Sequence, residues 1–174
     1  MTLSNVEQSA LRELLDKQAC IELVARYSRA LDWLDDDALK TVFWPDAEID
    51  FGFFKGRGDQ FSVAVMKVEH SLARRWHMTT NPIVKVSGDV AEGESYGLAA
   101  GVAIRAGRAV HDIFAGRYLD QFTRRSGEWR IARRVYVADW QRSFEADAAA
   151  ENGLVTGLNW SNGFTPNHPL FRKL

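Results

Sequence analysis

The N-terminal part of the chain places its apolar residues with the period of an α-helix. Between residues 6 and 33, large apolar side chains recur at spacings of three and four, and Glu, Arg and Lys fill the positions between them. This pattern predicts an amphipathic helix with at most one break.

Two shorter helices are predicted next. Asp35-Asp36-Asp37 is typical of a helix start, where acidic groups cap free backbone N–H groups and favour the positive end of the helix dipole. We therefore expect a short helix over residues 37–43, ended by Pro45. Apolar residues at helical spacing then predict a third helix over residues 59–72.

Strands are expected mainly in the second half of the chain. Apolar and polar residues alternate over residues 47–51, 76–86, 90–104 and 109–125, and in a last strand that ends at Trp140. The last two strands form a hairpin with a tight turn at Arg125-Ser126-Gly127. Helices grouped early and strands grouped late indicate an α+β fold, in which three helices cover one face of a curved antiparallel sheet.

One predicted strand carries mostly small residues on one of its faces. The small residues are Ala91, Gly93, Ser95, Gly97, Ala99 and Gly101. A face without large side chains either lets a helix approach closely or leaves space for a ligand. The sequence leaves both interpretations open.

The C-terminal residues follow a different pattern from the rest. They are rich in Gly, Asn and Pro but keep large apolar side chains, which a disordered tail does not normally do. A short helix fits residues 144–150. We expect one domain over residues 1–143 and a C-terminal arm, residues 144–174, that covers a pocket or packs on the domain or on a neighbouring subunit.

The composition limits the classes of partner and of cellular location. The chain has 174 residues, of which 46% are hydrophobic and 26% charged, as expected for a globular domain. Its net charge of -1 argues against nucleic acid or an anionic membrane as the main partner. Cys20 is the single cysteine, which excludes a disulfide framework within the chain. The N-terminus does not resemble a signal peptide, and the longest apolar run, over residues 97–104, is too short to cross a bilayer, so we expect a cytoplasmic protein.

Four polar residues lie on elements that are otherwise predicted to be buried: Tyr27, Asp32, His77 and Arg134. An Asp–His pair suits general acid–base catalysis, because a carboxylate fixes the imidazole tautomer and imidazole titrates near neutral pH. Arg134 could bind a developing oxyanion, and Tyr27 could donate a hydrogen bond to a substrate oxygen. An Asp near a helix end and a His flanked by Trp and Met are each, taken alone, more often structural, and the spacing of Asp32 and His77 in the sequence does not show that they meet.

The aromatic content favours an apolar substrate. Six Trp and ten Phe residues suggest an aromatic or polycyclic small molecule, whose burial would supply binding energy. The candidate substrate contacts are Trp33, Phe51, Trp76, His111 and Tyr136. We expect no metal and no cofactor, because no residues have recognised metal-ligand spacing and there is no nucleotide-binding loop or nucleophile elbow.

Four segments carry a resemblance to a known family. They read ARYSRALD at residues 25–32, FWPDA at 43–47, WHMTTN at 76–81 and GEWRIARRV at 127–135. In this order they resemble the SnoaL-like and scytalone-dehydratase-like branch of the nuclear-transport-factor-like superfamily, over roughly residues 10–141. The resemblance implies a cone-like α+β barrel.

The resemblance also implies site residues. The hexachlorocyclohexane dehydrochlorinase and the bile-acid 7α-dehydratase of this branch place an Asp, a His and an Arg at positions that correspond to Asp32, His77 and Arg134. A Tyr of the bile-acid enzyme corresponds to Tyr27. The chain departs from that enzyme near Ala100, where a second Asp would fall.

Residues and resemblance together predict a cofactor-independent lyase of the dehydratase type. His77 would remove a proton, Asp32 would orient the imidazole, and Arg134 with Tyr27 would hold oxygen. Carbon–carbon cleavage of a lignin-derived diaryl compound, an isomerase or cyclase with the same residues, and a non-catalytic ligand-binding module are the alternatives. The apolar arm and the resemblance favour a homodimer or homotrimer.

Overall fold

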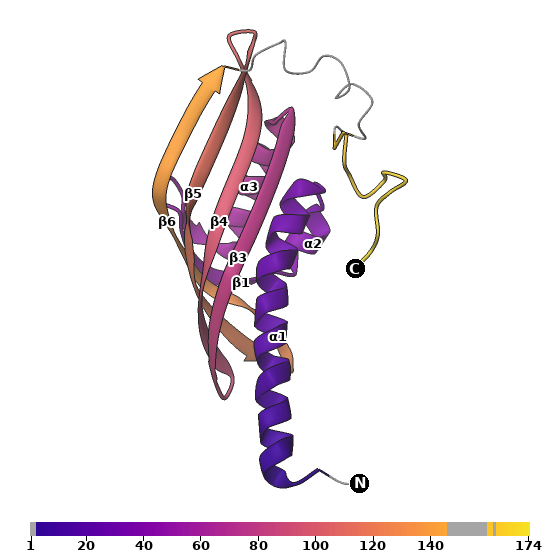
Figure 1. Ribbon diagram of the computed structural model, residues 1–174, viewed down its shortest axis with the longest axis vertical. Helices are drawn as coiled ribbons and strands as arrows, with labels where there is room; N and C mark the ends of the chain where they lie inside the picture. The colour runs from indigo at the N-terminus through magenta and orange to yellow at the C-terminus, as the bar shows by residue number, and fades with distance from the viewer. Residues whose placement is uncertain (1–2, 146–159, 162) are drawn as a thin grey trace.

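Three helices lie on one face of a curved, six-stranded sheet (Figure 1). A computed structural model describes residues 3–145, 160, 161 and 163–174. The elements are α1 (Asn5–Asp32), α2 (Asp36–Lys40), β1 (Phe43–Asp50), β2 (Lys55–Arg57), α3 (Gly58–Ser71), β3 (Arg74–Ser87), β4 (Val90–Arg105), β5 (Arg108–Arg125) and β6 (Glu128–Glu145). The predicted α+β class and the order of its predicted elements are confirmed, and the short strand β2 is an addition that the sequence pattern did not predict.

The sheet is mixed and open, which corrects two details of the expected architecture. Its strand order is β2-β1-β6-β5-β4-β3, and every neighbouring pair is antiparallel except β1 with β6, which is parallel. A parallel pair needs a long crossover connection, and here α3 and the four strands β2, β3, β4 and β5 provide it. Because β2 and β3 are free edges, the curved sheet does not close into a barrel.

Helix α1 is unbroken, but only part of its apolar stripe is buried. Ser4 and Glu7 cap its N-terminus reciprocally, and the C-terminal half buries a face that includes Tyr27 against the sheet. Leu14 and Leu15, which the helical pattern placed on the same stripe, are exposed. Asp16 beside them is buried and accepts a hydrogen bond from Trp129 of β6, so at this turn a different face of α1 packs against the sheet. Figure 1 shows that the first turns of α1 extend beyond the end of the sheet.

Helix α2 is shorter than expected. Asp35 caps it by accepting a hydrogen bond of 2.9 Å from the backbone N–H of Ala38. The helix ends at Lys40, and Phe43 already belongs to β1, so the predicted helix over residues 37–43 was too long. Pro45 lies inside β1 rather than ending the helix. It falls where the register between β1 and β6 shifts, a place that tolerates a residue without an N–H group.

The small residues of β4 make room for aromatic rings of the neighbouring strand, an outcome that differs from both expectations. A Cβ atom at Gly97 would lie 2.6 Å from Cε2 of Tyr118, and one at Gly93 would lie 3.0 Å from Cε2 of Phe122. Both rings belong to β5 and are buried in the core between sheet and helices. Glycine is therefore required at Gly97 by close packing rather than by a ligand.

The described part of the C-terminal arm contacts the end of α1. The ring of Phe164 stacks on Trp33 with centroids 4.2 Å apart, and Phe171 meets the same indole edge-on at 5.3 Å. Arg29 donates a hydrogen bond to the backbone carbonyl of Arg172. The helix expected over residues 144–150 lies mostly outside the described residues, and its first two residues end β6. Among the described helices, none combines the length and apolar character needed to span a membrane.

Candidate active site

Asp32 and His77 meet where the C-terminus of α1 lies beside β3. Oδ1 of Asp32 is 2.8 Å from Nδ1 of His77, and Oδ2 of Asp32 accepts a hydrogen bond of 3.1 Å from the backbone N–H of His77. The side chains are 22% and 10% exposed, so the pair is shielded but reachable. With Nδ1–H donating to the carboxylate, Nε2 is the ring nitrogen that can act as a base.

Glu69 lies on the other side of the His77 ring. Its Oε1 is 3.6 Å from Nε2 of His77, and its Oε2 is buried without a hydrogen-bond partner. Burial raises the pKa of Glu69, an effect that the nearby His77 and Arg75 reduce. Sequence reasoning missed this residue, although its spacing of four after Val65 and eight after Phe61 places it on the buried face of α3.

Arg134 and Tyr27 belong to a second buried cluster. Nε and Nη2 of Arg134 each donate a hydrogen bond of 2.7 Å to the Asp120 carboxylate. Cζ of Arg134 lies 4.5 Å from the ring centroid of Tyr27 and 4.3 Å from that of Tyr118. Burial disfavours the charged guanidinium, but the charge of Asp120 and its hydrogen bonds outweigh this and raise the pKa of Arg134. Nη1 of Arg134 is buried without a partner.

The phenols of the second cluster keep their protons at neutral pH. Burial raises the pKa of Tyr118 to about 12 and that of Tyr27 well above its usual range. Each can therefore donate a hydrogen bond but cannot act as a base at neutral pH.

The two clusters are neighbours rather than one contact group. Arg134 of β6 pairs with Asp120 of β5, which in turn pairs with Gly93 of β4. His77 of β3 pairs with Ala99 of β4, six residues further along the same strand. Six residues along a strand correspond to about 20 Å between these backbone levels. The carboxyl of Glu69 acts electrostatically on both His77 and Tyr27, and so lies between the two clusters.

Two of the proposed substrate contacts lie beside the second cluster. The ring of Phe51 stacks on Tyr136 with centroids 5.3 Å apart, and Tyr136 is 5.3 Å from Tyr118. Both rings are partly buried on the inner side of the sheet. They remain candidates for contact with an apolar molecule.

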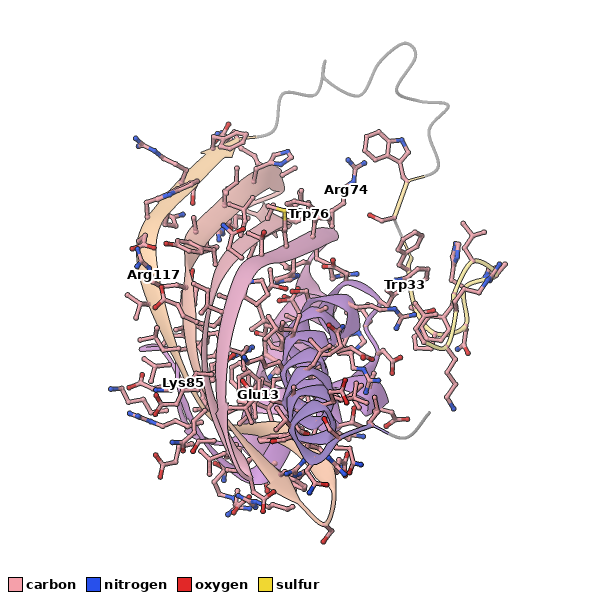
Figure 2. The ribbon with its side chains drawn as sticks, turned by 60° about the horizontal axis from the view of Figure 1, so that its bottom comes forward. Glu13, Trp33, Arg74, Trp76, Lys85 and Arg117 are labelled. Atoms are coloured by element: carbon pink, nitrogen blue, oxygen red, sulfur yellow. The ribbon has the colours of Figure 1, made fainter. Side chains whose placement is uncertain are left out.

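The other three proposed contacts are turned away from His77. Trp76 precedes His77 on β3 and is 49% exposed on the opposite, outer face, because successive strand residues point to opposite faces. His111 stacks on Phe144 on that same outer face, with ring centroids 5.2 Å apart. Trp33 packs on the C-terminal arm, and Figure 2 shows it directed away from the sheet. The sequence cannot decide these directions, since a one-residue step reverses the face of a strand.

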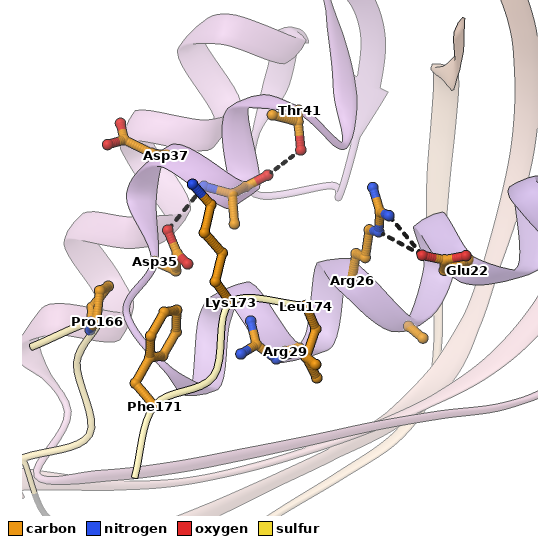
Figure 3. A pocket seen from close by; sticks show the side chains of 12 residues that line it. Glu22, Arg26, Arg29, Asp35, Asp37, Thr41, Pro166, Phe171, Lys173 and Leu174 are labelled. Atoms are coloured by element: carbon orange, nitrogen blue, oxygen red, sulfur yellow. Dashed lines mark hydrogen bonds and ion pairs between the residues drawn. The ribbon is translucent and has the colours of Figure 1, made fainter. Parts of the chain in front are cut away.

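Three cavities lie within the described residues, and none of them is lined by Asp32 or His77. The first, of about 730 Å³, lies between α1, α2 and the C-terminal arm (Figure 3). Apolar side chains such as Phe171 and Leu174 line it, together with the charged groups of Arg29 and Lys173. The second, of about 680 Å³, is a groove on the outer face of the sheet, and the third, of about 370 Å³, lies between β1 and α3.

The described side chains form no metal centre. Within residues 3–145, 160, 161 and 163–174, no three His, Cys, Asp or Glu residues cluster in a way that could hold a metal ion.

Comparison with known proteins places the chain in a structural context. Residues 12–135 match the model of the SnoaL-like domain. The uncharacterized protein Rv2910c of Mycobacterium tuberculosis is 32% identical over 137 residues, which cover 76% of this chain and 92% of that protein.

Two solved structures share the fold. The hexachlorocyclohexane dehydrochlorinase LinA-type3 of Novosphingobium barchaimii superposes with a TM-score of 0.69 at 20% identity, covering 78% of this chain and 94% of that one. A scytalone dehydratase-like protein of Novosphingobium aromaticivorans has a TM-score of 0.67 at 21% identity, covering 78% and 91%.

Proposed function

The chain belongs to the SnoaL-like domain family, and from this premise we propose that it is a cofactor-independent lyase of the dehydratase type. Its substrate would be a hydrophobic aromatic or polycyclic small molecule. The observation that carries the proposal is the pair of hydrogen bonds between Asp32 and His77. One joins the carboxylate to Nδ1 of the ring at 2.8 Å, and the other joins it to the backbone N–H at 3.1 Å. A carboxylate that fixes both the position and the tautomer of an imidazole prepares it as a general base.

The proposed reaction is a β-elimination. Nε2 of His77 takes a proton from a carbon that a neighbouring carbonyl or aryl group activates, the electron pair of that C–H bond forms the new double bond, and a neighbouring C–O bond breaks. The negative charge of Asp32 stabilises the imidazolium that forms. Arg134 and Tyr27 support an oxygen of the substrate, for which the partnerless Nη1 of Arg134 is the available guanidinium donor.

The same groups are compatible with related reactions. Carbon–carbon cleavage of a lignin-derived diaryl compound, isomerisation and cyclisation all need a positioned base beside an activated carbon. The arrangement of Asp32 and His77 supports proton transfer in each of these reactions and does not specify the group that departs.

A non-catalytic ligand-binding module is the second candidate. The cavity of about 730 Å³ favours it, since its apolar and charged lining comes from α1, α2 and the arm, and excludes Asp32 and His77. A module of this kind would bind an apolar molecule there and leave it unchanged.

One experiment separates the two candidates. We would incubate the protein with a panel of aromatic and steroid alcohols and compare the wild type with His77→Ala, using His111→Ala on the outer face as the matched control. Loss of turnover in His77→Ala alone, with ligand binding retained, supports the lyase. Binding without turnover in the wild type supports the module, and mass spectrometry of ligand that co-purifies would identify the substrate class directly.

We also propose that the chain forms a homodimer or homotrimer through the outer face of β3–β6. Trp76, Met78, Trp140 and Phe144 are all exposed on this face, an unusual amount of apolar surface for a monomer. A net charge of -1 adds little repulsion between copies. Light scattering would show a monomer for Trp140→Glu and an unchanged oligomer for Val63→Glu, a control at an exposed apolar residue of α3. A monomeric wild type would contradict the proposal.

A further inference from the structure

We propose that Glu69 is the proton donor that complements His77, delivering a proton to the departing oxygen of the substrate. The inference rests on the proposed function, because a donor is needed only if His77 acts as a base. Its starting point is the gap of 3.6 Å between Oε1 of Glu69 and Nε2 of His77, the ring nitrogen that Asp32 leaves free.

The surroundings of Glu69 explain why it would hold a proton. Its side chain is 7% exposed, and Oε2 is buried without a hydrogen-bond partner, which is costly for an ionised carboxylate. The guanidinium of Arg75 acts on Glu69, but its Nε and Nη2 donate to the backbone carbonyls of Glu69 and Leu72 instead of to the carboxylate. The favourable state of such a carboxyl is the neutral acid, and burial accordingly raises the pKa of Glu69.

The charged and titratable groups that face Glu69 come from four elements. Asp32 and Tyr27 lie on α1, His70 is its neighbour on α3, His77 and Arg75 lie on β3, and Tyr118 lies on β5. Asp32 opposes ionisation of Glu69, whereas His77, Arg75 and His70 favour it. A proton taken up by His77 therefore makes ionisation of Glu69 easier at the moment at which the donor must release its own proton.

The proton balance closes over one turnover. Nε2 of His77 takes the proton from carbon, the C–H electron pair becomes the new double bond, and the C–O electron pair leaves with oxygen. Glu69 gives its proton to that oxygen, so that water departs. The imidazolium then returns a proton from Nε2 to the Glu69 carboxylate across the 3.6 Å gap, and both groups regain their starting states.

The test varies the leaving group. Glu69→Gln keeps the shape of the side chain and removes its acidic proton. Substrate alcohols need a proton donor, whereas the acetate esters of the same alcohols leave as stable anions and do not. We expect Glu69→Gln to lower kcat for the alcohol at least about 100-fold and to stay within about 5-fold of the wild type on the ester, while His77→Ala loses both activities.

Two further readouts separate a chemical role from a structural one. With the alcohol, wild-type kcat should fall as pH rises through the pKa of Glu69, and with the ester this fall should be absent. Asp16→Asn is the matched control, a buried carboxylate on α1 remote from His77, and it should lower the melting temperature without changing the ratio of alcohol to ester turnover.

The remaining outcomes contradict either the donor role of Glu69 or the lyase proposal, and the two cases can be told apart. Equal losses of Glu69→Gln on alcohol and ester would show that Glu69 only positions His77, and full activity on the alcohol would remove it from the reaction. If the wild type turns over neither compound, the lyase proposal fails. The carboxyl ¹³C NMR signal of Glu69, which is assigned by its absence in Glu69→Gln, then shows whether this carboxyl holds a proton. A titration in the ordinary glutamate range overturns the donor role; a raised one supports a held proton.

Discussion

Asp32 binds His77 through two different atoms of the histidine, one on the ring and one on the backbone, although 45 residues separate them in the sequence. The two bonds use both carboxylate oxygens. One carboxylate therefore sets the position of β3 against the end of α1 and the tautomer of the imidazole at the same time.

The first prediction separates these two effects. Asp32→Asn keeps an oxygen that can accept from the backbone N–H of His77, but it removes the negative charge beside Nδ1. We expect kcat to fall at least about 100-fold with little change in melting temperature. ¹⁵N NMR of the His77 ring would report the altered tautomer, and a fully active variant with a native ring spectrum would contradict the role of Asp32.

The second prediction concerns pH and stability. Burial raises the pKa of Glu69 above 4.5, its ordinary value, in the folded chain. The folded state therefore holds this proton more tightly than the unfolded state, and the free energy of unfolding falls as pH rises from about 4.5 through the raised pKa. Glu69→Gln should lose this part of the pH dependence. Denaturant titrations between pH 4 and 8 would measure it, and parallel curves for both proteins would refute the assignment.

The third prediction tests how α1 is attached to the β5–β6 hairpin. Oδ1 of Asp16 accepts hydrogen bonds from the indole nitrogen of Trp129 at 2.9 Å and from Arg124 at 2.7 Å. Asp16→Ala leaves both donors without this acceptor and should reduce the free energy of unfolding by about 2–3 kcal/mol. Glu13→Ala, which removes an exposed ion pair on the same helix, should change it little. Equal effects of the two variants would contradict the anchoring role.

The fourth prediction tests the close contact of Gly97 with Tyr118. A methyl group at Gly97 would lie 2.6 Å from a ring that is held by its neighbours Tyr27 and Tyr136. Gly97→Ala should therefore cost about 1–3 kcal/mol of the free energy of unfolding. Gly101→Ala, on the same face of β4, has its one tight contact with the end of the flexible Leu72 side chain at 3.0 Å and should cost less. Thermal unfolding of the two variants compares them, and the reverse order would show that the Tyr118 ring is free to move.

Local pattern was sufficient for most of the elements, and residue type with the family resemblance was sufficient to name the candidate acid–base pair. Helical spacing predicted α1 and α3, alternation predicted β3 to β6, and Ser126 and Gly127 both adopt the positive φ that a tight hairpin turn requires. These features depend on neighbours in the sequence, so they can be recognised without coordinates. Asp32 and His77 were singled out by their residue types and by the family resemblance.

Contacts between distant segments were decided only by the tertiary structure. The exposure of Leu14 depends on which face of α1 packs against the sheet, and the outward direction of Trp76 depends on the register of β3 with β4. The isolation of Glu69 depends on where the guanidinium of Arg75 is directed. These three outcomes arise when remote segments pack together, and the spacing of residues along one element does not fix them.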